Sequence, residues 1–182
     1  MIWIILIIIV VLVVYLISVY NKLIVLRNNR ENAFADIDVQ LKQRFDLVPN
    51  LVGTVKGYAS HEQAVYDKIT KARESYQSAW STDQKIAASN MLSGALNGLL
   101  AIVESNPELK ANTNFMQLQS ELADIENKIA ASRRYFNSAT KEYNTSLETF
   151  PNNVFANMFN FKKWEYFEVA NESEKEAPKV EF

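Results

Sequence analysis

Residues 33–62, AFADIDVQLKQRFDLVPNLVGTVKGYASHE, decide how the rest of the chain can fold. Pro49 stands in the middle of this segment, between two stretches with helical periodicity. Because proline lacks a backbone donor and its ring clashes with the preceding helical turn, a helix is expected to bend or to end there. The topology of the protein therefore depends on what the chain does at Pro49.

Two helical patterns meet at this proline. Before it, apolar residues recur at three- and four-residue steps and make one stripe on a helix: Leu23, Leu26, Phe34, Ile37, Leu41 and Phe45. After it, the positions from Leu51 to Ala79 alternate by four and three, with Glu62 as the single charge. Such spacing is typical of the seam of a packed bundle or a coiled coil.

We predict that the chain reverses at Pro49 and does not merely bend. A reversal gives a bundle of four antiparallel helices with short connections, in which each stripe has partners inside one subunit. A bend would leave the first stripe, at residues 21–45, exposed unless subunits associate through it.

The other helix ends are marked by capping residues and prolines. Ser81 and Thr82 offer an N-cap for a third helix, which ends at Asn106-Pro107. A fourth helix is expected from about Asn112 to Thr149, closed by Pro151. The sequence thus predicts an all-α bundle domain at 21–150. An aromatic amphipathic segment follows at 151–168 and a charged, flexible tail at 169–182.

The N-terminus is an uncharged apolar run. Residues 2–19, IWIILIIIVVLVVYLISV, are just long enough to cross a bilayer as a helix. A cleaved signal peptide would need a basic start and a small-x-small cleavage site, which this run lacks. We therefore predict a single-pass transmembrane anchor at residues 1–20. The cations that follow it, Lys22, Arg27 and Arg30, place the remaining chain in the cytoplasm.

Composition argues against several classes of function. Lys and Arg total 19 against 21 Asp and Glu, so a basic surface for nucleic acid is not expected. The absence of Cys excludes disulfides and a cysteine nucleophile. His61-Glu62 lacks the second histidine of a zinc metalloprotease helix, because Val65 stands in its place. We expect no catalytic residue, no metal site and no cofactor.

Glu62 is the charge with the largest expected structural consequence. A charge buried on a helix seam needs a partner. We predict that Glu62 faces Arg44, Arg133 or Arg134 and that the pair fixes the register of the helices. The alternative is a seam that opens to water at this turn. The acidic residues of the fourth helix are expected to be solvated on its outer face: Glu121, Asp124 and Glu126.

The aromatic segment NNVFANMFNFKKWEYFEV, residues 152–169, has three interpretations. It caps the core of the bundle, it rests on the membrane surface with lysines towards lipid headgroups, or it docks a protein partner. The residues that would contact a membrane or a partner are Phe155, Phe159, Phe161, Lys162, Lys163, Trp164 and Phe167.

The runs YNKLIVLRNNRENAFADID, IDVQLKQRFDLVPNLVGTVKGYASHE, IENKIAASRRYFNSATKEYNTSLETFP, FANMFNFKKWEYF and APKVEF resemble the LemA family of small bacterial membrane proteins. The resemblance implies a short membrane segment, then a cytoplasmic or membrane-apposed helical bundle without established enzymatic activity. Genes of the family often lie near one for a membrane-embedded heat-shock metalloprotease, which implies a link to membrane protein quality control. Asn160 replaces the glycine of the family's Phe-Gly-Phe, and asparagine tolerates a left-handed backbone.

These features favour a non-enzymatic adaptor or scaffold at the inner surface of a bacterial cell membrane. Its expected partner is a protein, with a membrane protease as one candidate. A second hypothesis is a structural subunit of a homo-oligomeric membrane assembly that uses the stripe at residues 21–45 as its contact. An enzyme that uses carboxylates is the third.

Overall fold

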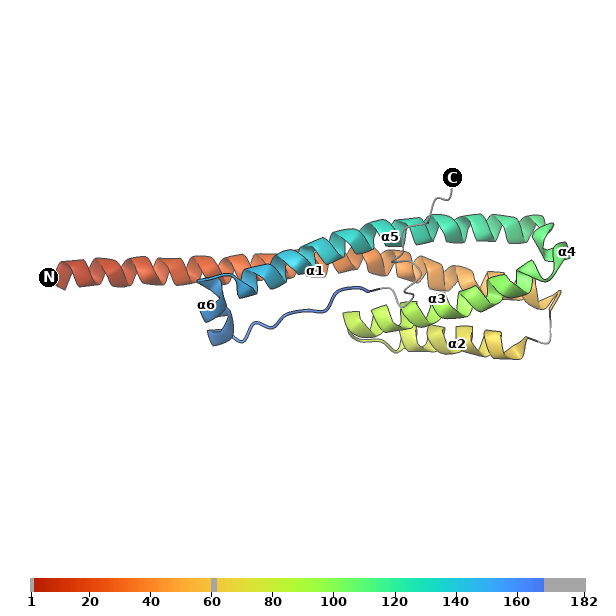
Figure 1. Ribbon diagram of the computed structural model, residues 1–182, viewed down its shortest axis with the longest axis horizontal. Coiled ribbons are helices and arrows are strands. Elements are labelled where there is room, and N and C mark those ends of the chain that lie inside the picture. The colour runs from red at the N-terminus through yellow and green to blue at the C-terminus, as the bar shows by residue number, and fades with distance from the viewer. Residues whose placement is uncertain (1, 60–61, 169–182) are drawn as a thin grey trace, which may run out of the picture. The chain divides into compact units, whose positions relative to one another are not determined.

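A computed structural model describes residues 2–59 and 62–168 (Figure 1). Every regular element in these residues is a helix, in the order α1 (Ile2–Lys56), α2 (Gln63–Gln77), α3 (Thr82–Glu104), α4 (Pro107–Lys110), α5 (Thr113–Glu148) and α6 (Asn152–Met158). The prediction of an all-α fold is confirmed for this part of the chain. The predicted tail at residues 169–182 lies outside the described residues.

The described residues form two compact units. Unit 1 contains residues 2–36 and 132–166, and unit 2 contains residues 37–59, 62–131 and 167–168. Helices α1 and α5 each contribute one part to each unit. Each unit has its own cluster of buried apolar side chains.

Pro49 lies inside α1, which continues to Lys56. The predicted reversal at Pro49 is therefore wrong. A proline inside a helix costs about 3 kcal/mol, whereas each fully buried valine or leucine contributes about 1.5–3 kcal/mol. The apolar residues on the same face around the proline, Val48, Leu51 and Val55, are at most 2% exposed. Their combined burial outweighs the cost of the proline.

The turn comes after Lys56 instead. Gly57 and Tyr58 form a turn, and α2 begins at Gln63. The predicted helix from Leu51 to Ala79 is thus two helices. The spacing of the seam did not reveal this break, because the apolar residues on both sides of the turn pack into the same core and keep the same three- and four-residue steps.

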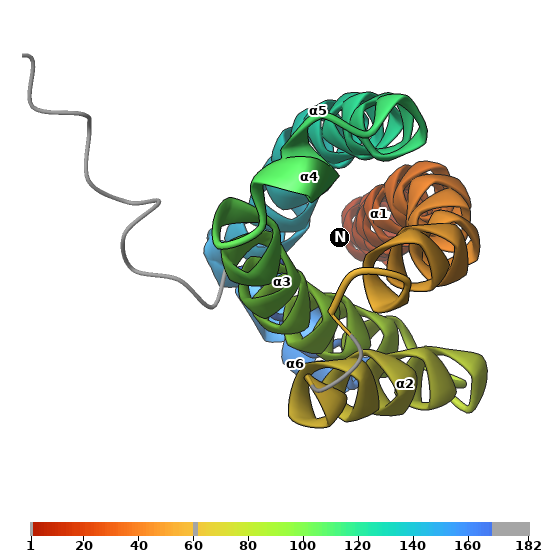
Figure 2. The same cartoon turned by 90° about the vertical axis from the view of Figure 1, so that its right-hand side faces the viewer.

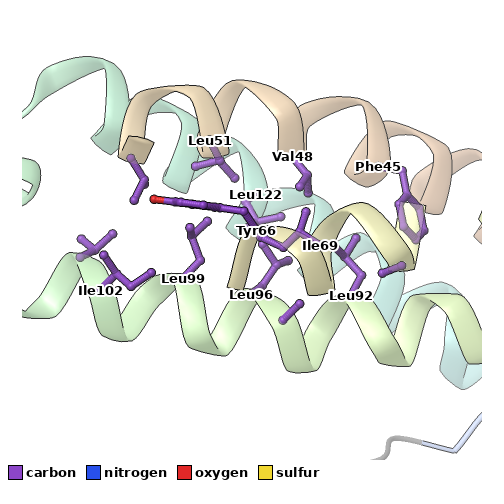
Figure 3. Close-up of a cluster of buried hydrophobic side chains, with 14 of the residues drawn as sticks. Phe45, Val48, Leu51, Tyr66, Ile69, Leu92, Leu96, Leu99, Ile102 and Leu122 are labelled. Atoms are coloured by element: carbon purple, nitrogen blue, oxygen red, sulfur yellow. The ribbon is translucent and has the colours of Figure 1, made fainter. Parts of the chain in front are cut away.

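In unit 2, α2 packs antiparallel to the last part of α1. Phe45 stacks on Tyr76 with ring centroids 4.2 Å apart, and further along α1 the amine of Lys56 lies 4.8 Å from the centroid of the Tyr66 ring. Figure 3 shows side chains of α1, α2, α3 and α5 meeting in one buried cluster. Its labelled members are Phe45, Val48, Leu51, Tyr66, Ile69, Leu92, Leu96, Leu99, Ile102 and Leu122.

Most of the other helix ends fall at the predicted residues. Ser81 is the N-cap of α3, and its hydroxyl oxygen accepts a hydrogen bond from the backbone N–H of Gln84 at 3.3 Å. Asn106 precedes the short α4, which connects α3 to α5 (Figure 2). The side-chain oxygen of Asn112 accepts a hydrogen bond from the backbone N–H of Phe115 at 2.9 Å and caps α5.

In unit 1, the first part of α1 packs antiparallel to the last part of α5. The rings of Phe34 and Phe136 meet edge to face with centroids 5.7 Å apart. A buried cluster lies nearer the start of α1 and the end of α5: Val19, Leu23, Leu26, Tyr143, Leu147 and Ala156. The last of these residues belongs to α6, so α6 packs on this pair of helices.

The apolar stripe at residues 21–45 is buried inside the subunit. Leu23, Ile37 and Leu41 have no exposed surface. These side chains pack against the same chain, so the exposed surface that was expected to form a homo-oligomeric contact is absent from this stripe.

The start of α1 carries a long exposed apolar surface. An 18-residue window in α1 has a mean hydropathy of 3.4, and only 6% of it is buried. A helix of this length and composition can cross a membrane, so α1 is compatible with the predicted anchor. Helix α3 also meets these two criteria, but 44% of its window is buried and its apolar residues pack in the core of unit 2.

We expect Pro49→Ala to raise the free energy of unfolding by about 1–3 kcal/mol, because alanine restores a backbone donor and removes the ring clash inside α1. Urea unfolding of the detergent-solubilised chain, followed by circular dichroism, measures the change. The exposed control Asn50→Ala is expected to change stability by less than about 0.5 kcal/mol. An unchanged or lower stability of Pro49→Ala would contradict a continuous α1, since proline is tolerated in the first turn of a helix.

Candidate functional site

Arg30 is the centre of a buried cluster in unit 1. Its side chain is only 2% exposed, and its guanidinium carbon lies 4.6 Å from the ring centroid of Phe136 and 4.5 Å from that of Trp164. Arg30 Nε donates a hydrogen bond to Thr140 Oγ1 at 3.2 Å, and Nη2 donates to the backbone oxygen of Glu165 at 3.4 Å. The cation is thus held between two aromatic faces, where cation–π attraction stabilises it.

The same cluster fixes the chain that follows α6. The side chain of Asn144 donates to the backbone oxygen of Trp164 at 2.9 Å and accepts from the backbone N–H of Trp164 at 3.0 Å. Tyr143 donates its hydroxyl hydrogen to the backbone oxygen of Lys162 at 3.2 Å. Burial raises the pKa of the Tyr143 phenol, so this donor keeps its proton. Side chains of α5 therefore hold the backbone of the extended chain at Lys162 and Trp164.

Asn160 makes the turn that leads into this extended chain. Its φ angle is 56°, which lies in the left-handed region. The expectation that asparagine replaces a glycine in a left-handed turn is confirmed, because the short polar side chain of asparagine is accepted there more readily than most.

Arg44 is the centre of a second buried cluster, in unit 2, and is also 2% exposed. Its Nε lies 2.7 Å from Glu126 Oε1. Its Nη1 donates to Ser89 Oγ at 3.1 Å, and its Nη2 donates to Ser93 Oγ at 2.7 Å. The two serines are four residues apart and so lie on one face of α3. Arg44 thereby links α1 to α3 and to α5.

Glu62 does not take the predicted position on a buried seam. It is exposed and forms the N-cap of α2, and its side chain makes no capping hydrogen bond. The carboxylate paired with Arg44 belongs to Glu126, one of the three acidic residues predicted to be solvated, and the Glu126 side chain is 40% exposed. Arg133 is half-buried and Arg134 is exposed. That a charge pair fixes helix register stays a prediction, now for Arg44 and Glu126.

The sequence does contain a signal for both clusters. Arg30 stands four residues after Leu26 and four before Phe34, at the place in the apolar stripe where an apolar residue is missing. Arg44 lies directly before Phe45, three residues after Leu41. A cation at a stripe position is expected to be buried, so its N–H groups need hydrogen-bond acceptors on other helices.

The aromatic segment contacts the end of the apolar run in α1. The rings of Tyr15 and Phe155 have centroids 6.1 Å apart, and Tyr20 lies 5.1 Å from Phe159 and 5.8 Å from Phe161. All these contacts meet edge to face, an arrangement that aromatic pairs favour.

Other residues of the aromatic segment differ in exposure. Phe167 is buried, and Lys162 and Lys163 are exposed. Lys163 forms an ion pair with Glu148. The segment therefore divides into side chains that pack in the protein and side chains that remain available to a membrane or a partner.

A polar network in unit 2 holds Tyr76. Its hydroxyl donates to Asp38 Oδ1 at 2.8 Å, and Lys85 Nζ lies 2.6 Å from Asp38 Oδ2. Burial raises the pKa of Tyr76, and the hydrogen bond to Asp38 and its negative charge raise it further. This network joins α1, α2 and α3.

The described residues contain no group of three or more His, Cys, Asp or Glu side chains that could hold a metal ion. His61 lies outside the described residues. The two arginine clusters link segments that lie far apart in the sequence, Arg30 in unit 1 and Arg44 in unit 2. The absence of catalysis stays a prediction.

The sequence profile of the LemA family matches residues 33–182. The chain belongs to the LemA family. Magnetosome protein MamQ of Magnetospirillum gryphiswaldense is 24% identical over 174 residues, which cover 81% of this LemA-family chain and 64% of that protein. Magnetosome protein MamQ 2 of Paramagnetospirillum magneticum is 24% identical over 175 residues, covering 82% and 64% of the two chains.

Another relative carries the family name itself. Protein LemA of Metamycoplasma hominis is 26% identical over 140 residues, which cover 75% of this chain and 63% of that protein. The LemA-family chain thus spans less than two thirds of the length of these curated relatives.

We expect Trp164→Ala to lower the free energy of unfolding of this LemA-family chain by about 1–3 kcal/mol, because Arg30 loses one of its two aromatic faces. Trp164→Phe keeps an aromatic face and should lose less than half as much. Cleavage by trypsin after the exposed Lys162 and Lys163 should quicken in Trp164→Ala, because the segment loses its side-chain contact with Arg30 of α1. Equal cleavage rates for all three chains would contradict the role of the Arg30 cluster.

The raised pKa of Tyr76 makes stability depend on pH. The folded state disfavours the phenolate, so the contribution of Tyr76 is fully present below its unfolded pKa of about 10 and is lost as the pH rises above it. In urea titrations at about pH 8 and pH 11, Tyr76→Phe should show a smaller fall in unfolding free energy than the unmodified chain. Tyr135→Phe, at an exposed position, should keep the full fall.

Proposed function

We propose that this protein is a non-enzymatic adaptor or scaffold, tethered to a bacterial cell membrane by the start of α1, that presents its helices to a protein partner. The observation that carries the proposal is the continuity of α1. This helix begins with exposed apolar residues and ends among the buried side chains of unit 2. A single helix that is both anchor and core element suits a tether better than a freely diffusing protein.

The internal contacts support an adaptor more than an enzyme. Arg30 and Arg44, the two nearly completely buried cations among residues 2–59 and 62–168, are engaged by aromatic rings, hydroxyl groups, a backbone oxygen and Glu126. The polar groups of a catalytic site usually line a pocket, whereas these two guanidinium groups make their contacts inside the protein. In this proposal the helices form an antiparallel up-and-down bundle in the cytoplasm, single-pass at the inner membrane. The partner belongs to membrane protein quality control, for which a membrane protease is the first candidate.

Trp80 is the side chain that best suits partner binding. It lies between α2 and α3 and is 85% exposed, while its backbone N–H donates to the side-chain oxygen of Gln84 at 2.9 Å. Tryptophan is enriched among the residues that dominate protein interfaces, because a large rigid side chain gives much contact area at low entropic cost. The hydrogen bond to Gln84 holds the backbone of this exposed residue in place.

Proximity labelling in cells tests this function. A biotin ligase fused to the C-terminus labels neighbours of the full chain, and an adaptor predicts one or a few proteins enriched at the membrane. We expect Trp80→Ala to lower that labelling at least about fivefold, a loss of roughly 1 kcal/mol in binding. Tyr135→Ala, which removes another exposed aromatic side chain, is the matched control and should leave the labelling unchanged.

The molecular mass in detergent distinguishes an adaptor from a homo-oligomeric assembly. An adaptor is a monomer that gains mass only when its partner is added. A defined multimer of the chain alone would favour the structural assembly, which would have to use a surface other than the buried stripe. Labelling that does not respond to Trp80→Ala would contradict the proposed contact.

A further inference from the structure

A groove opens in unit 1 beside the end of the apolar run of α1. It has a volume of about 490 Å³, within the range of ligand sites in proteins. Its lining comes from α1, α5 and α6 and includes Lys22, Ser138, Lys141, Glu142, Thr145 and Asn152. On α5, Lys141 and Glu142 follow Ser138 by three and four residues and precede Thr145 by four and three, so these residues share one face of the helix.

The groove lies at a defined depth if the apolar run crosses a bilayer. Lys22 follows the last residue of the run, Val19, by about 4.5 Å along the helix axis at 1.5 Å per residue. Lipid headgroups occupy roughly the first 5–8 Å beyond the hydrocarbon on each side of a bilayer. Lys22 therefore lies at the depth of the headgroup phosphates.

Helix α6 supports the same depth. Phe155 of α6 contacts Tyr15, and Phe159, the C-cap residue, contacts Tyr20, which places the helix beside the last turns of the apolar run. Val154 and Met158 on α6 expose most of their side chains, and exposed apolar residues on a short helix beside a span favour the boundary between hydrocarbon and water. Asn152, at the start of this helix, also lines the groove.

The charges of the groove favour an anion with one negative charge. Lys22 and Lys141 are exposed, and within the described residues neither amine takes part in an ion pair. Glu142 leaves the lining with a net charge of one positive unit. The hydroxyl groups of Ser138 and Thr145 can donate to phosphate oxygens, as can the two amines. The carboxylate of Glu142 can accept from a hydroxyl group of the ligand.

We propose that this groove binds the headgroup of an anionic phospholipid, with Lys22 and Lys141 on the phosphodiester and Glu142 on hydroxyl groups of a glycerol headgroup. The site fastens unit 1 to the membrane surface beside its own anchor. The proposal rests on the membrane tether of the proposed function and is independent of the protein partner. A failed lipid test therefore leaves the labelling result of Trp80→Ala intact.

Native mass spectrometry of the detergent-purified full chain tests the site. The chain is titrated with dioleoyl-phosphatidylglycerol and, separately, with dioleoyl-phosphatidylcholine. We expect one phosphatidylglycerol molecule to be retained at least about tenfold more strongly than phosphatidylcholine, because two lysines each add to the attraction of an anionic headgroup. The double variant Lys22→Gln with Lys141→Gln should abolish this preference.

Two further variants separate the groove from the overall charge. Lys68→Gln with Lys71→Gln makes the same change of charge on exposed positions of α2 and should keep the preference. Ser138→Trp fills the groove without a change of charge and should lose the retained lipid. Circular dichroism and thermal unfolding of each variant confirm that the helices remain folded.

Three results would overturn the proposal. The first is equal retention of the two lipids by the unmodified chain. The second is a loss of preference in the α2 double variant as large as that in the Lys22 and Lys141 double variant, which would show an effect of net charge alone. The third is displacement of phosphatidylglycerol by millimolar inorganic phosphate, which would assign the groove to a soluble anion.

Discussion

A cation that replaces an apolar residue in a helix stripe must have its donors satisfied by other parts of the chain. Helix α1 carries two such cations, Arg30 in unit 1 and Arg44 in unit 2. Leaving either one buried without partners would cost several kcal/mol. The chain meets this requirement differently in the two units. Arg30 lies between two aromatic rings, and Arg44 pairs with a carboxylate and two hydroxyl groups.

The partners of Arg30 explain why the chain after α6 follows a fixed course. Trp164 supplies one aromatic face, and the Asn144 amide bonds to the backbone of the same residue. The backbone groups of Trp164 and the backbone oxygen of Lys162, in a segment outside any helix, thereby find partners on α5. At Trp164, an aromatic residue in this segment therefore serves the buried guanidinium of Arg30 as well as apolar packing.

The requirements on α1 change along its length. Its first residues expose apolar side chains, which is tolerable only in a hydrocarbon or against other protein surfaces. Its later residues bury the same kinds of side chain against α2, α3 and α5. Both parts belong to one continuous helix. It passes through Pro49 because the free energy gained by burying apolar side chains on both sides of the proline exceeds the cost of a proline inside a helix. The proposed tether and the proposed headgroup groove both follow from this change along a single helix.

The sequence alone indicated the helical class, the apolar run at residues 2–19, the N-cap at Ser81, the approximate bounds of the helix from Asn112 to Thr149, and the tolerance of Asn160 for a left-handed backbone. Each of these depends on local spacing or on the backbone preference of one residue, which neighbouring residues in the chain reveal. Tertiary structure decided that α1 passes through Pro49, that the turn follows Lys56, and that Glu126 rather than Glu62 pairs with Arg44. Those outcomes depend on free energies summed over side chains from several helices. Because residues far apart in the sequence contribute to each of these free energies, a short stretch of sequence does not predict the outcome.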